Sequence, residues 1–512
     1  MYRVVLSAAA MIAASLWLTT SAQQPEDAPG RRTILSDISA PAIDRGLREH
    51  DAPIEARTAD SGRLTSAGHE PFLRGSLIVK FRAGTSAAAR TAMLGRVNGA
   101  ETRALPYADF DVVTIGERAD PEAVARALDA QPDVEYAQAR YRVHASFVPN
   151  DPLYSRQWNL PAIDMERAWD INPGATNAVT VAVLDTGAAY RSSVVRFTGA
   201  AWALDDGVRF PALGPVDVPF AAAPDLGGPD RFVSPRDFIW NDTTPFDLDG
   251  HGTHVAGTVG ELTNNNLGVA GMAFNVRIMP VKVIDSLWDA IFSRPFAGTD
   301  DVVARGIRYA ADNGAKVLNM SIGRNGPPAP VVQAAISYAV GLGTFVVVAG
   351  GNEFQSGNPI EQIAEFAPRI DGMVAVASIG PDRRRAFYST TAPYIELAAP
   401  GGDQQSVGST GGILQQSFDL DLVDTFLRGP AGYRAPRFDS FAYQYFQGTS
   451  MAAPHVAGFA ALLMQQGITS PAAIEAAMKQ YATDLGTPGR DDEYGYGLIN
   501  PRAALRGMGL AK

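Results

Sequence analysis

The 512-residue sequence contains no cysteine and only six histidines. The absence of cysteine excludes disulfide bonds, a thiol nucleophile and any zinc site built on cysteine. Charged residues make up 19% of the chain and hydrophobic residues 46%, a balance that excludes global disorder and allows a large buried core. Without disulfides, stability must come from the size of that core, from bound ions, or from both.

Long apolar runs are also scarce, and the one near the start has the features of an export signal. Residues 1–22 contain Arg3, then an almost wholly apolar stretch from Val4 to Leu18, and end in the small residues Thr20-Ser21-Ala22. The alternative, an uncleaved membrane anchor, requires a longer apolar run, and no later stretch is long enough to span a bilayer. We therefore expect a secreted or periplasmic protein without a stable membrane anchor after signal removal.

Basic residues are outnumbered, and the net charge is −11. The excess of acid lies in residues 150–512, which hold 26 basic and 36 acidic residues, whereas residues 1–149 hold 17 and 18. A surface that binds nucleic acid needs clustered positive charge. The sequence therefore indicates no nucleic-acid partner.

Two stretches of different composition follow the signal. Residues 23–70 are polar without a sustained period, which predicts a loosely ordered leader. Residues 71–147 are predicted to form a small α/β domain, because short apolar strands alternate with helices, and a further strand near Thr102 would complete a split βαβ sandwich. The predicted elements are strands at 76–81, at 110–115 and from 134, and helices at 86–97 and 120–128.

Residues 148–512 are predicted to form a doubly wound α/β domain with a mostly parallel sheet. Apolar runs of five or six residues are typical of buried parallel strands, and Ala-rich segments between them indicate crossover helices. The expected strands are 179–184, 277–283, 315–319, 344–349 and 373–377, and the expected helices are 256–262, 300–312 and 330–341. Segments 190–235 and 403–445 interrupt this rhythm and are predicted to be loop insertions.

A serine lies where a loop turns into an apolar helix. Ser450 stands in the segment Gly448-Thr449-Ser450-Met451-Ala452-Ala453-Pro454-His455, just before a long apolar run. A serine at a helix start can be the N-cap. It can equally be a nucleophile at the positive end of the helix dipole. The choice depends on whether the chain also supplies a base, an orienting acid and an oxyanion donor.

Asp185 ends a buried strand in the segment Val181-Ala182-Val183-Leu184-Asp185-Thr186-Gly187. In a doubly wound sheet, functional groups gather at the carboxyl ends of the strands. A helix cap or a sheet-edge aspartate is the simpler interpretation. A ribose ligand of a dinucleotide enzyme is a further alternative, but it requires a G-x-G-x-x-G turn after the strand, which residues 185–190 do not provide.

Two of the six histidines occur in Asp249-Gly250-His251-Gly252-Thr253-His254, which opens an apolar helix. Zinc sites on helices favour an i, i+4 spacing with a glutamate between the ligands, whereas His251 and His254 are three apart. A base flanked by glycines is therefore the better interpretation of His251. His254 is predicted to be a packed core histidine.

Asn352 follows another predicted strand, in Val346-Val347-Val348-Ala349-Gly350-Gly351-Asn352-Glu353. The simple interpretation is an Asn/Gly turn. The functional one is a side-chain amide donor beside glycines that let a substrate backbone approach.

Together and in this order, the four segments resemble the subtilisin family of serine peptidases over roughly residues 148–506. The resemblance implies that Asp185, His251 and Ser450 form a catalytic triad, with Asn352 as an oxyanion donor. It also implies that Ser321, Ile322 and Gly323 form one wall of the primary specificity pocket, and Gly350 and Gly351 the opposite wall. Protein or peptide substrates would bind by strand addition. We expect a monomeric serine endopeptidase; the alternative is an inactive, peptide-binding relative on the same fold.

The first domain resembles the inhibitory propeptide of that family, through Val134-Glu135-Tyr136-Ala137-Gln138 and the segment 141–145. Pro149-Asn150-Asp151-Pro152-Leu153-Tyr154 resembles the start of a mature thermitase-type enzyme. The resemblance implies a zymogen whose own propeptide is an intramolecular inhibitor, removed by self-processing near residues 144–149.

A structural calcium ion is implied by the same resemblance, because segment 262–269 is similar to the family's calcium loop. Hard cations prefer several oxygen ligands. The implied ligands are the side chains of Asp151 and Asn265 and the carbonyls of Leu262, Leu267 and Val269. The family's second acid has no counterpart at 191–195, and Asp205 or Asp206 is a possible replacement. Asp237, Asp242 and Thr244 resemble a second site, and an Asn-rich solvated turn is the alternative for the first.

Overall fold

The computed structural model describes residues 72–104, 107–141, 147–204, 206–292, 298–324 and 326–507. The predicted signal and leader, residues 1–70, lie outside the described residues, as do the junction 142–146 and Asp205. No helix within the described ranges is long and apolar enough to cross a membrane.

The first unit is a four-stranded antiparallel sheet with strand order β2-β3-β1-β4. Its elements are β1 (Phe72–Phe81), α2 (Ala87–Gly95), β2 (Ala100–Ala104), β3 (Asp111–Thr114), α3 (Pro121–Asp129) and β4 (Val134–Tyr141). The helices begin where the sequence provides caps: Ser86 accepts a hydrogen bond from Ala89 N, and Asp120 accepts one from Glu122 N. The apolar side chains of the strands and helices form a core of their own, which includes Leu77, Val113 and Leu128.

The second unit is built on a seven-stranded parallel sheet with strand order β10-β11-β5-β12-β13-β14-β15. The strands are β5 (Thr180–Asp185), β10 (Arg236–Asp237), β11 (Arg277–Lys282), β12 (Val317–Met320), β13 (Phe345–Ala349), β14 (Met373–Ile379) and β15 (Leu397–Pro400). The central strands are buried along their whole length, which explains why they appear in the sequence as continuous apolar runs. This sheet confirms the predicted fold class.

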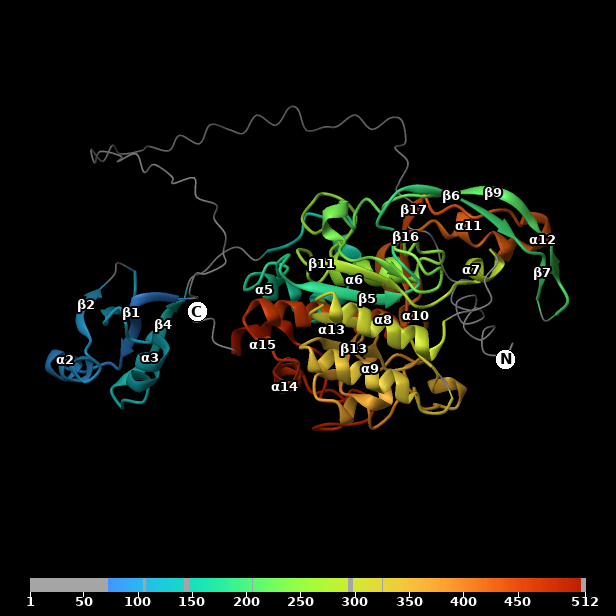
Figure 1. Ribbon diagram of the computed structural model, residues 1–512. Helices are drawn as coiled ribbons and strands as arrows, with labels where there is room; N and C mark the ends of the chain where they lie inside the picture. Colours follow the sequence, from blue (N-terminus) through green and yellow to red (C-terminus); the bar gives the residue numbers. More distant parts are fainter. Residues whose placement is uncertain are drawn as a thin grey trace, which may run out of the picture.

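Helices connect and cover these strands (Figure 1). They are α6 (His251–Gly260), α8 (Asp300–Asp312), α9 (Pro330–Gly341), α13 (Thr449–Gln465), α14 (Pro471–Tyr481) and α15 (Pro501–Gly507). Helix α13 is buried on every side between Met451 and Met464, because it packs on α6 and on β5, β12, β13, β14 and β15. The start of this helix is therefore held firmly against the carboxyl ends of the strands.

The two segments predicted as loop insertions contain strands and short helices, so the expectation that they are loops was wrong. The first forms antiparallel pairs between β6 (Ser193–Gly199) and β9 (Leu213–Phe220) and between β7 (Trp202–Ala203) and β8 (Arg209–Phe210). The second contains the hairpin of β16 (Ile413–Phe418) and β17 (Phe441–Phe446), with the short helices α11 (Leu420–Val423) and α12 (Gly429–Gly432) between its strands.

The two insertions pack on each other through aromatic rings, at the end of the molecule drawn at upper right in Figure 1. Phe220 of the first stacks on Phe438 of the second, with centroids 5.0 Å apart, and Trp202 meets Tyr433 edge to face at 6.2 Å. Backbone hydrogen bonds also link the two segments: Phe438 N–H donates to Pro219 O, and Ala221 N–H donates to Phe438 O, both at 3.0 Å.

Candidate active site

Asp185 is the last residue of β5, the strand beside the centre of the large sheet. Its side chain is fully buried, and its Oδ1 atom lies 2.7 Å from His251 Nδ1 and accepts a hydrogen bond from Thr186 N at 2.7 Å. The close approach of helix α6 to this strand end requires glycine, because a Cβ on Gly252 would lie 2.2 Å from Gly187 O. The sequence pattern thus brings the predicted acid and base together.

His251 is the first residue of α6, after the N-cap Gly250, whose φ of 112° lies in the left-handed region. A buried carboxylate, that of Asp247, holds this turn. Asp247 Oδ1 accepts hydrogen bonds from Thr186 Oγ1 and Gly250 N, at 2.9 Å each, and its Oδ2 accepts from Thr253 N at 2.9 Å. One side chain therefore joins the residue after Asp185 to the turn that carries His251.

The electrostatic surroundings of His251 favour its protonated form. Burial of the ring lowers its pKa, but the charge and hydrogen bond of Asp185, followed by the charges of Asp249 and Asp247, outweigh burial and raise the pKa above its usual 6.5. An imidazolium formed during a reaction is consequently stabilised at this position.

His254 is a core residue, as expected from the sequence. Its ring is fully buried, stacks on Phe446 at 4.4 Å, and donates from Nε2 to the carbonyls of Ile413 and Gln444 at 3.0 and 3.2 Å. Burial lowers its pKa to about 3, so it is neutral. The described residues contain no group of three or more acidic or histidine side chains that could hold a metal.

Ser450 is the second residue of α13, and Gly448 occupies the N-cap position, so the serine is not the helix cap. Its hydroxyl donates to the carbonyl of Ser321 at 3.2 Å, and Ser321 Oγ donates to the carbonyl of Ser450 at 2.7 Å. Within the described residues Ser450 Oγ makes no hydrogen bond with His251. In ligand-free enzymes this contact often forms only when substrate is bound.

Asn352 lies next to the start of α13, and Thr449 fixes its amide group. Asn352 Oδ1 accepts hydrogen bonds from the backbone N–H of Thr449 at 2.8 Å and from its hydroxyl at 2.9 Å. Because the amide oxygen is engaged in this way, the NH₂ group of Asn352 remains as the donor.

The two predicted pocket walls flank the same turn. Ser321, Ile322 and Gly323 follow β12, and Gly350 and Gly351 follow the neighbouring strand β13. The first wall contacts this turn through the two Ser321–Ser450 hydrogen bonds, and the second contacts it through Gly351 N–H, which donates to Thr449 Oγ1 at 3.2 Å.

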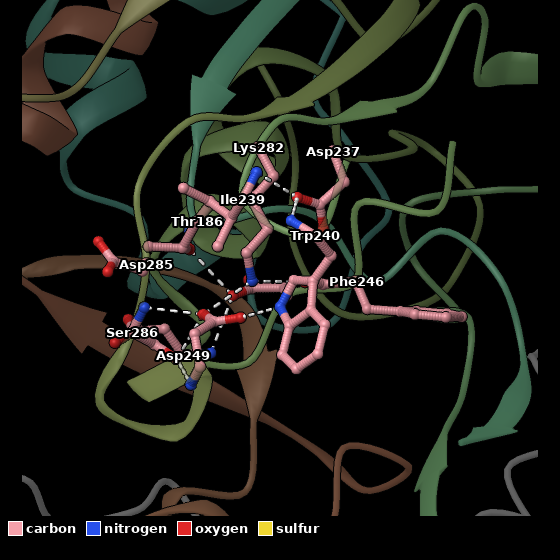
Figure 2. A network of polar contacts seen from close by, with 12 residues as sticks. Thr186, Asp237, Ile239, Trp240, Phe246, Asp249, Lys282, Asp285 and Ser286 are labelled. Atoms are coloured by element: carbon pink, nitrogen blue, oxygen red, sulfur yellow. Dashed lines mark hydrogen bonds and ion pairs between the residues drawn. The ribbon is translucent and has the colours of Figure 1, made fainter. Parts of the chain in front are cut away.

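A buried ion pair lies at the end of the neighbouring strand β11, within the polar network of Figure 2. Lys282 is the register partner of Asp185 on β11, and its Nζ donates to Asp289 Oδ2 at 2.9 Å and to Phe246 O at 3.0 Å. Trp240 Nε1 and Ser286 Oγ donate to the same Asp289 carboxylate, at 2.5 and 2.9 Å. The network ties the segment before His251 to the carboxyl end of β11.

Two carboxylates accept hydrogen bonds from the predicted calcium loop. Asp151 accepts hydrogen bonds from the backbone N–H groups of Asn264 and Asn265, at 2.8 and 3.1 Å. Asp225, from the first insertion, accepts from Asn265 Nδ2 at 2.7 Å and from Val269 N at 3.1 Å. The second acid at this loop is therefore Asp225, not Asp206.

The remaining predicted ligands belong to the same loop, where Leu262 N donates to Asp225 O at 2.8 Å and Leu267 N donates to Asn265 Oδ1 at 2.8 Å. Burial raises the pKa of the Asp225 carboxyl to about 6. The neighbouring Glu261 is buried with neither carboxylate oxygen hydrogen-bonded to a described residue, and burial raises its pKa well above the usual range. Added positive charge would stabilise this group of acids.

At the second resembled site, the acid oxygens already accept local hydrogen bonds. Asp237 Oδ1 accepts from the backbone N–H groups of Ile239 and Trp240, and Asp242 Oδ1 accepts from the N–H and hydroxyl of Thr244. The positive charge beside Asp237 is that of Lys282, its register partner on β11.

Four residues of these networks were missed by sequence reasoning: Asp225, Asp247, Asp289 and Thr449. Thr449 and Asp247 lie within four residues of a predicted catalytic residue, and that proximity was the available signal. Asp225 and Asp289 gave no local signal, because their partners are distant in the sequence.

Comparison with known proteins agrees with this geometry. A sequence model of the subtilase family matches residues 176–497, more than half of the chain. The chain belongs to the subtilase family. A second model, of the fervidolysin N-terminal prodomain, matches residues 58–139, which begins inside the stretch predicted as a leader. This subtilase is therefore a serine endopeptidase made with a prodomain.

Its relatives include a thermophilic serine proteinase from Bacillus sp. (strain AK1), 32% identical over 85% of this chain and 88% of the relative. Thermitase from Thermoactinomyces vulgaris is 31% identical over 70% of this subtilase and all of thermitase. Among solved structures, a protease from Pseudoalteromonas arctica is 30% identical, with a TM-score of 0.52, and covers 70% of this chain and 99% of that one.

Proposed function

We propose that Ser450 is the nucleophile of this protease, His251 its general base and Asp185 the acid that orients the base. The observation that carries the proposal is the 2.7 Å contact between Asp185 Oδ1 and His251 Nδ1 at the strand end. It leaves Nε2 of the imidazole to take a proton. A serine hydroxyl is a weak nucleophile at neutral pH and needs such a base.

The reaction proceeds in two halves. Ser450 Oγ attacks the carbonyl carbon of the scissile peptide bond while its proton passes to His251 Nε2. The C–N bond then breaks, the amine leaves with that proton, and the acyl group remains on Ser450. In the second half, a water gives a proton to His251 Nε2 and attacks the acyl carbon; the bond from that carbon to Ser450 Oγ then breaks, and His251 returns the proton to Oγ as the acid leaves.

The negative oxygen of each tetrahedral intermediate needs fixed donors. We propose that the NH₂ group of Asn352 and the backbone N–H of Ser450 provide them, at the N-terminus of α13. Segments 321–323 and 350–351 would bind an extended substrate by backbone hydrogen bonds, leaving side-chain preference to the pocket between them.

Substitution of the serine tests the assignment. Ser450→Ala is expected to remove cleavage of casein and labelling by a fluorophosphonate, without changing the melting temperature by more than a degree or two. Ser417→Ala, which removes the hydroxyl that donates to Gly250 O, is the comparison variant and should remain labelled. A purified, processed Ser450→Ala protein that still cleaves casein would show that Ser450 is not the nucleophile.

We further propose that the protein is exported and removes its own propeptide. The apolar residues 4–18 and the prodomain match support this, as does a relative from Xanthomonas campestris named as an extracellular protease, 31% identical. In a host without background proteolysis, the Ser450→Ala chain should keep its N-terminal domain while wild type loses it. Equal loss in both would refute self-processing.

Calcium is proposed as a stabilising ion at the 262–269 loop, where Asp151, Asp225 and Asn265 offer oxygen atoms from side chains. When bound, it would supply positive charge among buried acids and stiffen the loop. EGTA should then lower the melting temperature, and excess calcium should restore it. Asp225→Asn should reduce the EGTA effect, and a melting temperature indifferent to EGTA would contradict the proposal.

A further inference from the structure

A buried carboxylate, that of Glu361, lies against both predicted walls of the primary pocket. A Cβ placed on Gly323 would lie 2.6 Å from Glu361 Oε2, and one placed on Gly351 would lie 3.4 Å from Glu361 Cβ. The residue itself is only 6% exposed. Both walls also contact the turn that carries Ser450, so the carboxylate is near the bond to be cleaved.

Hydrogen bonds hold Glu361 in this position. Its Oε1 atom accepts from Arg324 N at 2.6 Å, directly after the first wall, and from Ile363 N at 3.3 Å. Its own N–H donates to the hydroxyl of Tyr394 at 3.0 Å, and that hydroxyl donates to Gly350 O, in the second wall, at 3.4 Å. The carboxylate is therefore held beside the first wall, and the backbone of Glu361 is linked to the second wall through Tyr394.

The other oxygen, Oε2, is free to bind a ligand. It accepts no hydrogen bond from any described residue, yet it is not among the fully enclosed side-chain atoms, so it keeps contact with solvent. A carboxylate oxygen that is fixed, mostly desolvated and open on one side is a strong acceptor for a charged donor. The other oxygen of the carboxylate, Oε1, already accepts hydrogen bonds from two N–H groups. A cationic group that enters the predicted pocket would therefore bind at Oε2.

The charged groups around Glu361 do not neutralise it. The guanidinium of Arg324 is paired with Asp300 Oδ1 at 2.7 Å, and Glu353, next to Asn352, adds a second negative charge. Burial raises the pKa of Glu361 to about 7; the N–H donors of Arg324 and Ile363 and the charge of Arg324 lower it in part, and the charge of Glu353 adds to the rise. The carboxylate is ionised above that pH, and within the described residues no cationic side chain forms an ion pair with it.

We propose that Glu361 makes this protease select lysine or arginine at P1, the residue on the amino side of the cleaved bond. The proposal rests on the pocket assignment above. A P1 side chain that extends between Gly323 and Gly351 would place its ammonium or guanidinium at Oε2. An apolar side chain of the same length would instead leave the carboxylate unpaired and desolvated, which is unfavourable.

Peptide p-nitroanilides that differ only at P1 test the proposal at pH 9. With lysine, arginine, methionine and glutamate at P1, wild type should give kcat/KM for lysine and arginine about tenfold to a hundredfold above methionine, with glutamate lowest. Glu361→Gln keeps an acceptor for Arg324 N and Ile363 N but removes the charge. It should reduce the lysine-to-methionine ratio at least tenfold, with methionine cleavage within about twofold of wild type.

The control is Glu166→Gln, on α5 (Met165–Trp169). It removes a carboxylate that accepts a hydrogen bond from the Tyr154 hydroxyl, and it should leave the P1 ratios unchanged. If wild type prefers apolar P1 residues, or if Glu361→Gln preserves the preference for lysine, the proposal is overturned. Fluorophosphonate labelling separates this failure from failure of the proposed function, in which Ser450 is unlabelled and no peptide is cleaved.

Inhibition of wild type by two small molecules at pH 9 gives a test that does not depend on the folding of a variant. Benzamidine, a cation, should inhibit at least tenfold more strongly than neutral benzamide at pH 9, and the difference should shrink towards pH 5 as Glu361 protonates. His251 gains positive charge over the same range, so the contribution of Glu361 is the part of the pH dependence that Glu361→Gln removes. Equal inhibition by both compounds at pH 9 would contradict the proposal.

Discussion

The backbone N–H and the hydroxyl of Thr449 both donate to Asn352 Oδ1, at 2.8 and 2.9 Å. The same hydroxyl accepts a hydrogen bond from Gly351 N at 3.2 Å. Thr449, the residue immediately before the proposed nucleophile, therefore fixes the amide of Asn352. In this orientation the NH₂ group of Asn352 is left to donate to a substrate.

Thr449→Val should lower kcat about threefold to tenfold with little change in KM, because it loosens Asn352 without removing it. Thr449→Ser, which keeps the hydroxyl, should behave like wild type. In an Asn352→Ala background, Thr449→Val should add almost nothing, since the threonine acts through the amide. Steady-state kinetics of the four variants measure this coupling, and fully independent effects would refute it.

Activity should rise with pH through a midpoint above the usual 6.5 of histidine, because only neutral His251 accepts the serine proton and neighbouring acids raise its pKa. Asp249→Asn removes one of these charges and should move the midpoint of kcat/KM down by about one unit. The profile is best measured at low salt. Asp382→Asn, on the surface beside Arg384, should leave the midpoint unchanged.

Asp247→Asn should reduce both stability and kcat. An amide in place of the carboxylate would turn an NH₂ group towards a donor such as Gly250 N or Thr253 N, which would then have no acceptor. We expect the free energy of unfolding to fall by about 1–3 kcal/mol. Urea unfolding in a Ser450→Ala background avoids self-digestion. Unchanged stability together with normal kcat in the active background would show that the Asp247 contacts do not position His251.

Lys282→Met should destabilise the protein by about 3–5 kcal/mol, because it leaves the buried carboxylate of Asp289 without its cation. Lys316→Met, at an exposed position, should change the unfolding free energy by less than about 0.5 kcal/mol. Replacing both members, Lys282→Met with Asp289→Leu, should recover part of the loss. If the double variant were as unstable as the sum of the single ones, the ion pair would not be the cause.

The central sheet was predictable from the sequence because its strands are buried on both faces. Runs such as 179–184 and 344–349 correspond to β5 and β13 within one or two residues. The proposed triad could also be predicted, since each member ends a strand or lies at the start of a helix within a short, distinctive segment. Its partners Asp185 and His251 are indeed in contact.

What the sequence did not predict depends on contacts between distant segments. The strands of the insertions are short and rest on aromatic packing, so no apolar run marks them. Asp225 contacts Asn265 only after the first insertion folds back on the 262–269 loop. Glu361 was overlooked for the same reason, because nothing in its own segment points to Gly323.

The stacking of Phe220 on Phe438 has a consequence for how this enzyme could be altered. Each insertion covers apolar rings of the other, so shortening either one alone would expose those rings to water and invite aggregation. The two segments, which are separated in the sequence by strands β10 to β15, therefore form one transplantable part. A chimera with another subtilase would have to exchange them together.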